Sequence, residues 1–147
     1  MTTCYLCLTE GFPASGKSTW AAQQAAADPQ ILLVSRDDIR AMLRPNWNFD
    51  EATNRADERL VTSIQLGIVS EALAARRPVI CHNTNLYQWQ YADLLDVARA
   101  RRVEVRYQRF LDVPIEVCIE RDAPRPPGRR VGAVAMRKMH AAWLESL

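Results

Sequence analysis

Short apolar runs alternate with longer amphipathic stretches along the chain. The short runs are rich in apolar, β-branched and aromatic side chains, and they predict strands at residues 4–9, 31–34, 78–81 and 103–110. The longer stretches have helical periodicity, and they predict helices at residues 20–27, 37–43, 50–77, 88–101, 114–121 and 132–144. Strands that alternate with helices predict an α/β protein with a parallel sheet of four to five strands flanked by helices.

Two segments add detail to this pattern. In the longest helix, residues 50–77, a buried stripe is predicted because apolar side chains recur at every fourth position, at Leu60, Ile64, Ile68 and Ala72. Residues 123–130 combine three prolines with three arginines. Proline has a fixed backbone angle and no N–H group, so this segment is predicted to be irregular.

Length and composition limit the class of protein. The chain has 147 residues, of which 48% are hydrophobic and 24% charged, as in a water-soluble globular protein of one domain. No run approaches the roughly 20 apolar residues of a membrane span, and no signal peptide precedes the first strand. We therefore expect a single domain over residues 1–147 in the cytoplasm, with no membrane contact.

Four cysteines raise the question of a metal or redox site, since Cys4 and Cys7 form a C-x-x-C pattern. On one strand, side chains three positions apart point to opposite faces and cannot hold the same ligand. Cys81 falls in another apolar strand run and Cys118 in a predicted helix. We therefore expect four buried thiols, with neither zinc nor a disulfide.

The segment Gly11-Phe-Pro-Ala-Ser-Gly-Lys-Ser-Thr19 matches the phosphate-binding P-loop, G-x-x-x-x-G-K-[ST]. It lies between a predicted strand and a predicted helix, the order that this loop needs. Backbone N–H groups and the helix N-terminus would face the phosphates of a nucleoside triphosphate. We therefore predict a P-loop NTPase fold, with a nucleotide site formed by Gly11, Pro13, Ala14, Ser15, Gly16, Lys17, Ser18 and Thr19.

Two side chains of the loop have predicted roles. Lys17 would reach the β- and γ-phosphates of ATP or GTP, and the Ser18 hydroxyl would bind Mg²⁺. Between residues 121 and 138 the chain also has six basic residues against one acidic residue. Such a stretch is usually a solvated face, but beside a P-loop it also suits a polyphosphate or phosphodiester.

Polar residues follow the second and third predicted strands, where ligands of an open parallel sheet bind. Ser35 and Asp38 fit a capping box at the start of a helix, which leaves Asp37 without a structural role. A carboxylate beside a P-loop can accept the proton of an attacking hydroxyl group, so Asp37 is the candidate general base. Arg40, one turn later, would hold an anionic group of the acceptor or lie on the surface.

These landmarks resemble the kinase domain of phage polynucleotide 5′-kinase, an enzyme of nucleic acid repair. The resemblance rests on Gly11–Thr19, on Arg36-Asp37-Asp38-x-Arg40, on Thr84-Asn85-Leu86 and on Asp112-Val113-Pro114, and it covers essentially the whole chain. It implies that Asp37 activates the 5′-OH of a single-stranded or nicked nucleic acid and that Arg40 holds the neighbouring phosphate. No Asp-x-Asp-x-Thr phosphatase motif is found, so a kinase alone is implied.

The resemblance also implies an Arg-rich lid at about residues 122–131. Arg125 would neutralise the transferring phosphoryl group, although the prolines can shift the pairing to Arg129 or Arg130. Arg121 and Val131 would flank the nucleotide base, with Arg129 also at the nucleotide. Mg²⁺ is the implied cofactor, and the oligomeric state is left open.

The chain departs from the family at Asn83, where the family has an acidic residue. Asparagine brings no charge to a magnesium shell, so either this acid is dispensable or the chemistry differs. His82 beside it is a candidate substitute base, but an isolated histidine at a strand end is more often structural. Among Trp47, Phe49, Tyr87 and Trp89, we expect one to contact a nucleic acid base.

Three functions fit the sequence. The first is a kinase that moves the γ-phosphate of ATP or GTP to the 5′-OH of DNA or RNA. The second is a kinase of a small hydroxyl compound, such as a nucleoside, a sugar or a modified base. The third is an NTP-hydrolysing regulatory module, although the Asn-Lys-x-Asp motif of Ras-type GTPases is absent from the sequence.

Overall fold

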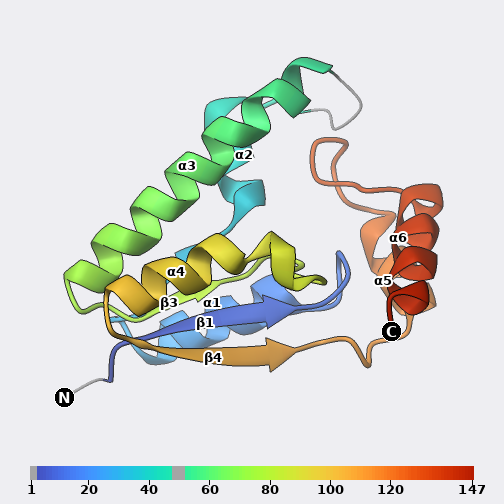
Figure 1. Ribbon diagram of the computed structural model, residues 1–147. Coiled ribbons are helices and arrows are strands. Elements are labelled where there is room, and N and C mark those ends of the chain that lie inside the picture. The colour runs from blue at the N-terminus through green and yellow to red at the C-terminus, as the bar shows by residue number, and fades with distance from the viewer. Residues whose placement is uncertain (1–2, 48–51) are drawn as a thin grey trace.

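The computed structural model describes residues 3–47 and 52–147. The strands are β1 (Tyr5–Glu10), β2 (Leu32–Val34), β3 (Val79–Cys81) and β4 (Glu104–Arg109). The helices are α1 (Lys17–Ala27), α2 (Arg36–Leu43), α3 (Ala52–Ala74), α4 (Ala92–Ala100), α5 (Ile115–Asp122) and α6 (Ala133–Glu145), with a 3₁₀ turn η1 (Gln88–Gln90) before α4. Figure 1 shows their arrangement.

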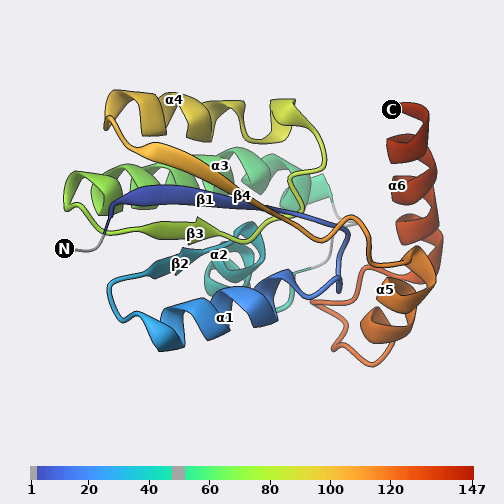
Figure 2. The ribbon, with the colours of Figure 1, turned by 90° about the horizontal axis from the view of Figure 1, so that it is seen from below.

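The four strands form one parallel sheet in the order β2-β3-β1-β4. Helices α3 and α4 cover one face of the sheet, and α1 covers the opposite face (Figure 2). Helices α5 and α6 stand beyond the carboxyl ends of the strands, with the 123–131 segment between them (Figures 1 and 2). The predicted α/β fold with a parallel sheet of four to five strands is therefore confirmed, with four strands in the described residues, and β3 is an inner strand.

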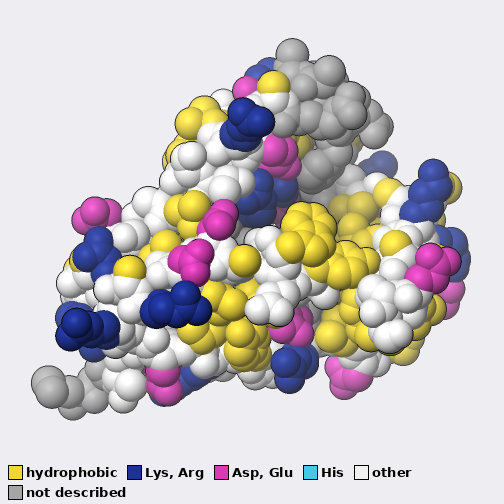
Figure 3. All heavy atoms as spheres, in the orientation of Figure 1, with side chains coloured by type: hydrophobic (Ala, Val, Ile, Leu, Met, Phe, Trp, Pro, Cys, Tyr) yellow, Lys and Arg dark blue, Asp and Glu magenta, His cyan; other side chains and the backbone are white. Residues whose placement is uncertain are grey.

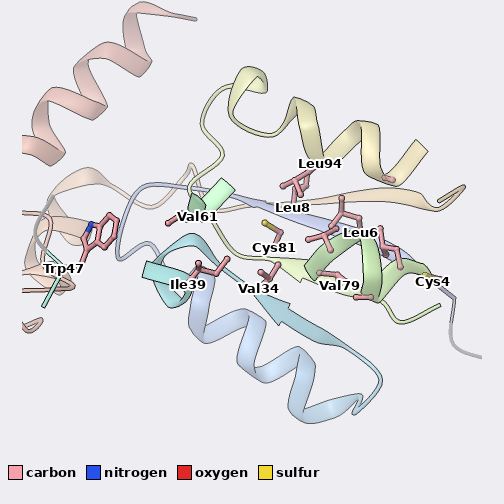
Figure 4. Close-up of a cluster of buried hydrophobic side chains, with 14 residues drawn as sticks. Cys4, Leu6, Leu8, Val34, Ile39, Trp47, Val61, Val79, Cys81 and Leu94 are labelled. Carbon is pink, nitrogen blue, oxygen red and sulfur yellow. The ribbon is translucent and has the colours of Figure 1, made fainter. Parts of the chain in front are cut away.

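The sheet separates two apolar clusters because side chains alternate along β1. Leu6 and Leu8 point toward α3 and α4, where they pack with Val79 and Leu94 in the larger cluster (Figure 4). Cys7 points the other way, into the smaller cluster with α1. A third cluster, around Phe12, Cys118 and Met136, joins the P-loop to α5 and α6. The sheet and the C-terminal helix pair are thus connected through the loop that would hold phosphate.

Helix α3 differs from its sequence prediction in length and in its buried stripe. It spans Ala52–Ala74 rather than 50–77, and the start of the prediction lies outside the described residues. Leu60 and Ile68 are 53% and 40% exposed, whereas Val61 and Val69 are buried. Val61, Gln65, Val69 and Leu73 are all buried and also recur at every fourth position, so the core-facing stripe lies one residue later than predicted. Ala72, the last position of the predicted stripe, is buried beside Leu73.

The predicted helix at residues 88–101 is divided in two. The 3₁₀ turn η1 ends at Gln90, and α4 begins at Ala92 after Tyr91, whose φ of −127° is not helical. Helix α5 begins at Ile115, one residue later than predicted, with Pro114 as its N-cap. The other elements lie within a few residues of their predicted bounds, and the segment 123–131 contains no helix or strand.

The four cysteines are buried and carry free thiols. Cys4 lies in the cluster under α3 and α4, while Cys7 lies in the cluster under α1, so their side chains occupy opposite faces. Within residues 3–47 and 52–147, no group of three or more His, Cys, Asp or Glu side chains is arranged to hold a metal ion. Over the same residues, no helix has the length and apolar character to cross a membrane.

Candidate functional site

The P-loop connects β1 to α1, and its two glycines have different reasons to be glycine. A side chain on Gly11 would lie 2.6 Å from Ser15 Oγ and 2.9 Å from Phe110 Cβ, so nothing larger than hydrogen fits there. Gly16 caps α1 with a φ of 108°, in the left-handed region that side chains disfavour. With Ala14 also at a positive φ of 63°, the loop curls around the N-terminus of α1. The Gly11 and Ser15 N–H groups already donate to the carbonyl oxygens of Thr84 and Phe12, so an anion would bind at the N–H groups of the first turn of α1.

Lys17 is the first residue of α1, and its ammonium group lies buried inside the loop. Nζ donates to the carbonyl oxygen of Phe12 at 2.7 Å and to Ser15 Oγ at 3.4 Å. Burial lowers the pKa of Lys17 to about 8, with Asp37 opposing the shift and Arg125 adding to it. The side chain therefore stays mostly protonated at neutral pH. Both acceptors are neutral oxygens, so a phosphate would bind the ammonium more strongly than they do.

Ser18 is paired with His82, a residue for which the sequence favoured a structural role over that of a base. Ser18 Oγ lies 3.0 Å from His82 Nδ1, and His82 Nε2 lies 3.7 Å from Asp38 Oδ2. Burial lowers the pKa of His82, although the Asp38 and Asp37 carboxylates oppose the shift. The imidazole is thus neutral at physiological pH and can orient the Ser18 hydroxyl. His82 directly follows β3, so its position at the carboxyl end of a strand was the available signal.

Asp37 lies in the first turn of α2 and pairs with Arg40. Asp37 Oδ1 accepts from Arg40 Nη1 at 2.7 Å, and its side chain remains 56% exposed. Arg40 also donates to Glu58 from α3, through Nη2 at 2.6 Å and Nε at 3.0 Å. Glu58, which no motif marks, accepts from Arg36 as well. This network fixes α2 against α3 and holds the Asp37 carboxylate in place.

The predicted capping box at the start of α2 is only half present. Ser35 Oγ accepts from the Asp38 N–H group at 3.1 Å, as a helix N-cap does. The carboxylate of Asp38 faces away to other partners, Arg129 Nη2 at 3.2 Å and the His82 ring. The capping interpretation of Asp38 is therefore wrong for its side chain, because a tertiary partner from the 123–131 segment competes with the helix end.

The 123–131 segment is closed at its base by Asp122. This carboxylate is 1% exposed and accepts from the N–H groups of Val131 at 3.0 Å and Gly132 at 2.8 Å. The loop that follows Asp122 therefore returns to its starting point. Arg130 donates to the Arg125 carbonyl oxygen, while Arg129 reaches Asp38.

A cavity of about 890 Å³ joins these elements. Many of the predicted site residues line it, namely Pro13, Ala14, Gly16, Lys17, Ser18, Thr19, Asp37, Arg40, Arg121, Arg125 and Val131. Gly11 and Ser15 belong to the same loop but are buried and do not line the cavity. Arg129 lines a smaller neighbouring cavity of about 250 Å³, which it shares with Asp37, Arg40, Trp47 and Pro126.

Four apolar or amide side chains of the large cavity were not selected from sequence. They are Trp20, Gln23, Phe110 and Met139. The Trp20 and Phe110 rings meet edge to face, with centroids 6.0 Å apart. Trp20 follows the P-loop within α1, and Phe110 ends the β4 run. Both positions lie next to predicted ligand-binding segments, but no motif marks them.

Asn83 has a structural role in the fold. Its Oδ1 accepts from the Arg36 N–H group at 2.8 Å, and its Nδ2 donates to Gln65 Oε1 at 2.7 Å. An ionised carboxylate has no donor and could not make the second bond. The amide therefore connects the end of β3 to both α2 and α3, which gives a structural reason for asparagine at this position.

The four candidate aromatic residues differ in exposure. Trp47 is 5% exposed, and Figure 4 shows it apart from the strand residues of its cluster. Phe49 lies outside the described residues. Tyr87 and Trp89 stack on one another, with ring centroids 6.0 Å apart and planes 11° from parallel, and Trp89 is 75% exposed.

The parallel sheet, its flanking helices and the loop between β1 and α1 define a P-loop kinase-like fold. The family model described as an AAA domain matches residues 6–147, and the chain belongs to this family. Family membership and site geometry thus agree on a P-loop kinase-like scaffold with a nucleotide-binding loop.

Solved structures share the fold. A chain of the Pnkp1/Rnl/Hen1 complex has a TM-score of 0.68 at 26% identity, over 82% of this chain and 40% of that chain. A chain of the Pnkp1/Rnl/Hen1 RNA repair complex has a TM-score of 0.77 at 24% identity, over 99% and 45%. A putative kinase from Chloroflexus aurantiacus j-10-fl has a TM-score of 0.67 at 17% identity, over 97% and 71%. The protein thus spans less than half the length of the two complex chains.

Proposed function

We propose that this protein is a polynucleotide 5′-hydroxyl kinase, which transfers the γ-phosphate of ATP or GTP to the 5′-OH of DNA or RNA. The observation that carries the proposal is the large cavity, in which the P-loop with Lys17 and Ser18 is joined by Asp37 and Arg40 from α2. A phosphate donor and a hydroxyl acceptor can meet there. The likeness to chains of an RNA repair complex supports a nucleic acid as the acceptor.

The donor would bind along the P-loop side of the cavity. Backbone N–H groups of the loop would cradle its phosphates, and Lys17 would exchange its neutral acceptors for phosphate oxygens. Arg121 and Val131, which line the same cavity, would flank the base. Residues 122–131 would act as the lid of a single kinase domain, with Asp122 closing the base of the lid.

A magnesium ion fits this donor side. Mg²⁺ is usually held by one or two protein oxygens, by substrate phosphates and by water, so the Ser18 hydroxyl beside a bound triphosphate is a sufficient protein anchor. His82 would keep that hydroxyl oriented. When bound, the ion would neutralise charge on the β- and γ-phosphates. Asn83 would not be a ligand, because its amide is engaged with Arg36 and Gln65.

The acceptor would approach Asp37, which would take the proton of the attacking hydroxyl group. The exposed carboxylate is held by Arg40 on one side, and a phosphate of the acceptor would compete with Glu58 for that guanidinium. Among the lid arginines, the geometry favours Arg125 for the transferring phosphoryl group. Arg125 lines the large cavity, whereas Arg129 pairs with Asp38 beside the smaller one.

The test is transfer of labelled γ-phosphate from ATP or GTP to a 5′-hydroxyl oligonucleotide, with the same strand bearing a 5′-phosphate as the blocked acceptor. Asp37→Ala should lose transfer by a factor of about 100 or more and still bind nucleotide, since general bases contribute about 10²–10⁴ in rate. Asp96→Ala, which removes a 70% exposed carboxylate on α4, is the matched control.

The outcomes separate the possibilities. Label on the 5′-hydroxyl strand alone, lost in Asp37→Ala and kept in Asp96→Ala, supports both the reaction and the base. Normal transfer by Asp37→Ala would reject the role of that residue. Nucleotide binding with no labelled strand would reject a polynucleotide acceptor.

A second candidate is a kinase of a small hydroxyl compound. The cavity of about 250 Å³ beside Asp37 and Arg40 favours it, because this volume suits one small acceptor between Trp47 and Pro126. Nucleosides and sugars offered in the same assay test this candidate. Salt gives a further distinction, since only an acceptor with several phosphates should bind much more weakly as salt rises.

A further inference from the structure

The turn Tyr87–Tyr91 presents aromatic rings to solvent in a fixed arrangement. Tyr87 and Trp89 are stacked nearly parallel, and Trp89 is 75% exposed although tryptophan is a side chain that usually gains from burial. Gln90 Oε1 accepts from the Tyr87 N–H group at 3.2 Å, which holds the turn closed. Figure 3 shows hydrophobic side chains gathered over η1, between α4 and the α5–α6 pair.

The turn is connected to the site by a short and well-anchored stretch of chain. Thr84 lines the large cavity, and three residues of chain reach at most about 11 Å, so Tyr87 lies close to it. Thr84 accepts from the Gly11 N–H group at 2.9 Å, and Asn85 donates to the Thr9 carbonyl oxygen at 2.9 Å. The rings therefore keep a fixed position relative to the P-loop.

The chemistry of this surface favours a nucleic acid strand over other occupants. Residues 87–91 carry no charge, so they suit the flat faces of bases rather than phosphates. A cationic side chain, that of Arg109, lies beside these aromatic residues. Tyr91 packs edge to face on Tyr107, and the guanidinium of Arg109 lies 5.6 Å from the Tyr107 ring centroid. Arg109 pairs with Glu10 but keeps 66% of its side chain exposed, within reach of a backbone phosphate.

We propose that the turn Tyr87–Tyr91 is a stacking platform for a base of a single-stranded acceptor, downstream of the 5′ nucleotide that is phosphorylated. This proposal rests on the proposed polynucleotide kinase activity. The platform would give the kinase a preference for acceptors of several nucleotides. Trp89 supplies the exposed ring, and Tyr87 stacks on it. A single nucleotide bound at Asp37 would not reach the platform.

The experiment compares acceptors of different length. KM is measured for a nucleoside 3′-monophosphate and for 5′-hydroxyl single strands of increasing length, with wild type, Trp89→Ala and Trp89→Phe. Stacking of one base on an aromatic ring corresponds to about a 5- to 160-fold change in binding. Trp89→Ala should raise KM for the long strands by this factor and leave KM for the mononucleotide unchanged. Trp89→Phe should restore much of the loss, because it keeps a ring.

Ile68→Ala is the matched control, since Ile68 is an apolar side chain on α3 with 40% exposure. Equal KM values for wild type and Trp89→Ala with every long strand would overturn the platform and leave the kinase proposal standing. A wild type that labels no strand would overturn the kinase proposal. In that case, binding of an unlabelled single strand is measured directly through the tryptophan fluorescence of the protein. Unchanged fluorescence would then reject the platform as well.

Discussion

Replacement of Lys17 by methionine should make the nucleotide-free protein more stable at neutral pH, although it removes the cation that would bind phosphate. Burial lowers the pKa of Lys17 from 10.5 to about 8. Each unit of pKa corresponds to about 1.4 kcal/mol, so keeping this ammonium charged costs the folded protein about 3 kcal/mol at neutral pH. Methionine has a similar length and carries no charge.

One interaction opposes this gain. Lys17 Nζ donates to the Phe12 carbonyl oxygen at 2.7 Å, and the variant leaves that oxygen without this donor. The loss of such a hydrogen bond costs about 1–2 kcal/mol. The charge effect is larger, so Lys17→Met should raise the free energy of unfolding by about 1–2 kcal/mol. For a domain of this size the melting temperature should rise by about 2–8 °C.

The sign of the effect should reverse with pH. An unfolded lysine keeps its proton up to a pKa of about 10.5, whereas the pKa of folded Lys17 is about 8. Between these values the unfolded state binds more protons, so the stability of the wild type rises with pH and the charge penalty disappears. The variant has no such dependence. The two stability curves should cross at about pH 9, and above it the wild type is favoured by its hydrogen bond.

Chemical denaturation from about pH 7 to about pH 10, without nucleotide, measures this difference directly. Lys138→Met is the matched control, because Lys138 is exposed on α6 and its replacement should change stability by no more than about 0.5 kcal/mol at any pH. A Lys17→Met protein less stable than wild type at neutral pH would refute the reasoning. A difference that does not vary with pH would refute it too.

Two further predictions concern the backbone around the site. Gly11→Ala should lower the free energy of unfolding by about 1–3 kcal/mol and weaken nucleotide binding, because its Cβ would lie 2.9 Å from Phe110 Cβ. The control is Gly67→Ala, at a mid-helix position with nothing within 4 Å of the added Cβ. In the same thermal melts this control should raise the free energy of unfolding by about 0.5–1 kcal/mol. Asp122→Ala should speed hydrogen exchange across residues 123–132, since the N–H groups of Val131 and Gly132 lose their acceptor. The control Asp96→Ala should leave this exchange unchanged. Unchanged exchange in Asp122→Ala would show that Asp122 does not hold this segment closed.

The parts of the site that could be predicted from sequence are those whose geometry is local. The P-loop is a continuous motif, and its strand, loop and helix follow one another, so the positions of Lys17 and Ser18 require no knowledge of distant contacts. The position of Asp37 beside the P-loop could be predicted almost as directly, because the carboxyl ends of parallel strands meet at one edge. The fold class follows from the same alternation of strands and helices.

The missing parts depend on pairs that are far apart in the sequence. Ser18 and His82 are separated by 64 positions, and Asp38 and Arg129 by 91. These pairs become neighbours only because β3 lies beside β1 in the sheet and because the 123–131 segment returns across the site. Hydrophobic periodicity predicts neither the order of the strands in the sheet nor the path of the 123–131 segment, since it reports only which side chains of one element face the core.

The two adjacent acids at the start of α2 illustrate why residue identity alone is insufficient. Successive side chains on a helix point about 100° apart, so Asp37 and Asp38 must face different neighbours. Asp37 turns toward Arg40 and the proposed acceptor, while Asp38 turns toward His82 and Arg129. Asp37 therefore serves the proposed acceptor side, and Asp38 contacts the proposed lid. An acid supplied at one of these positions cannot replace the other, even though the two carboxylates are chemically identical.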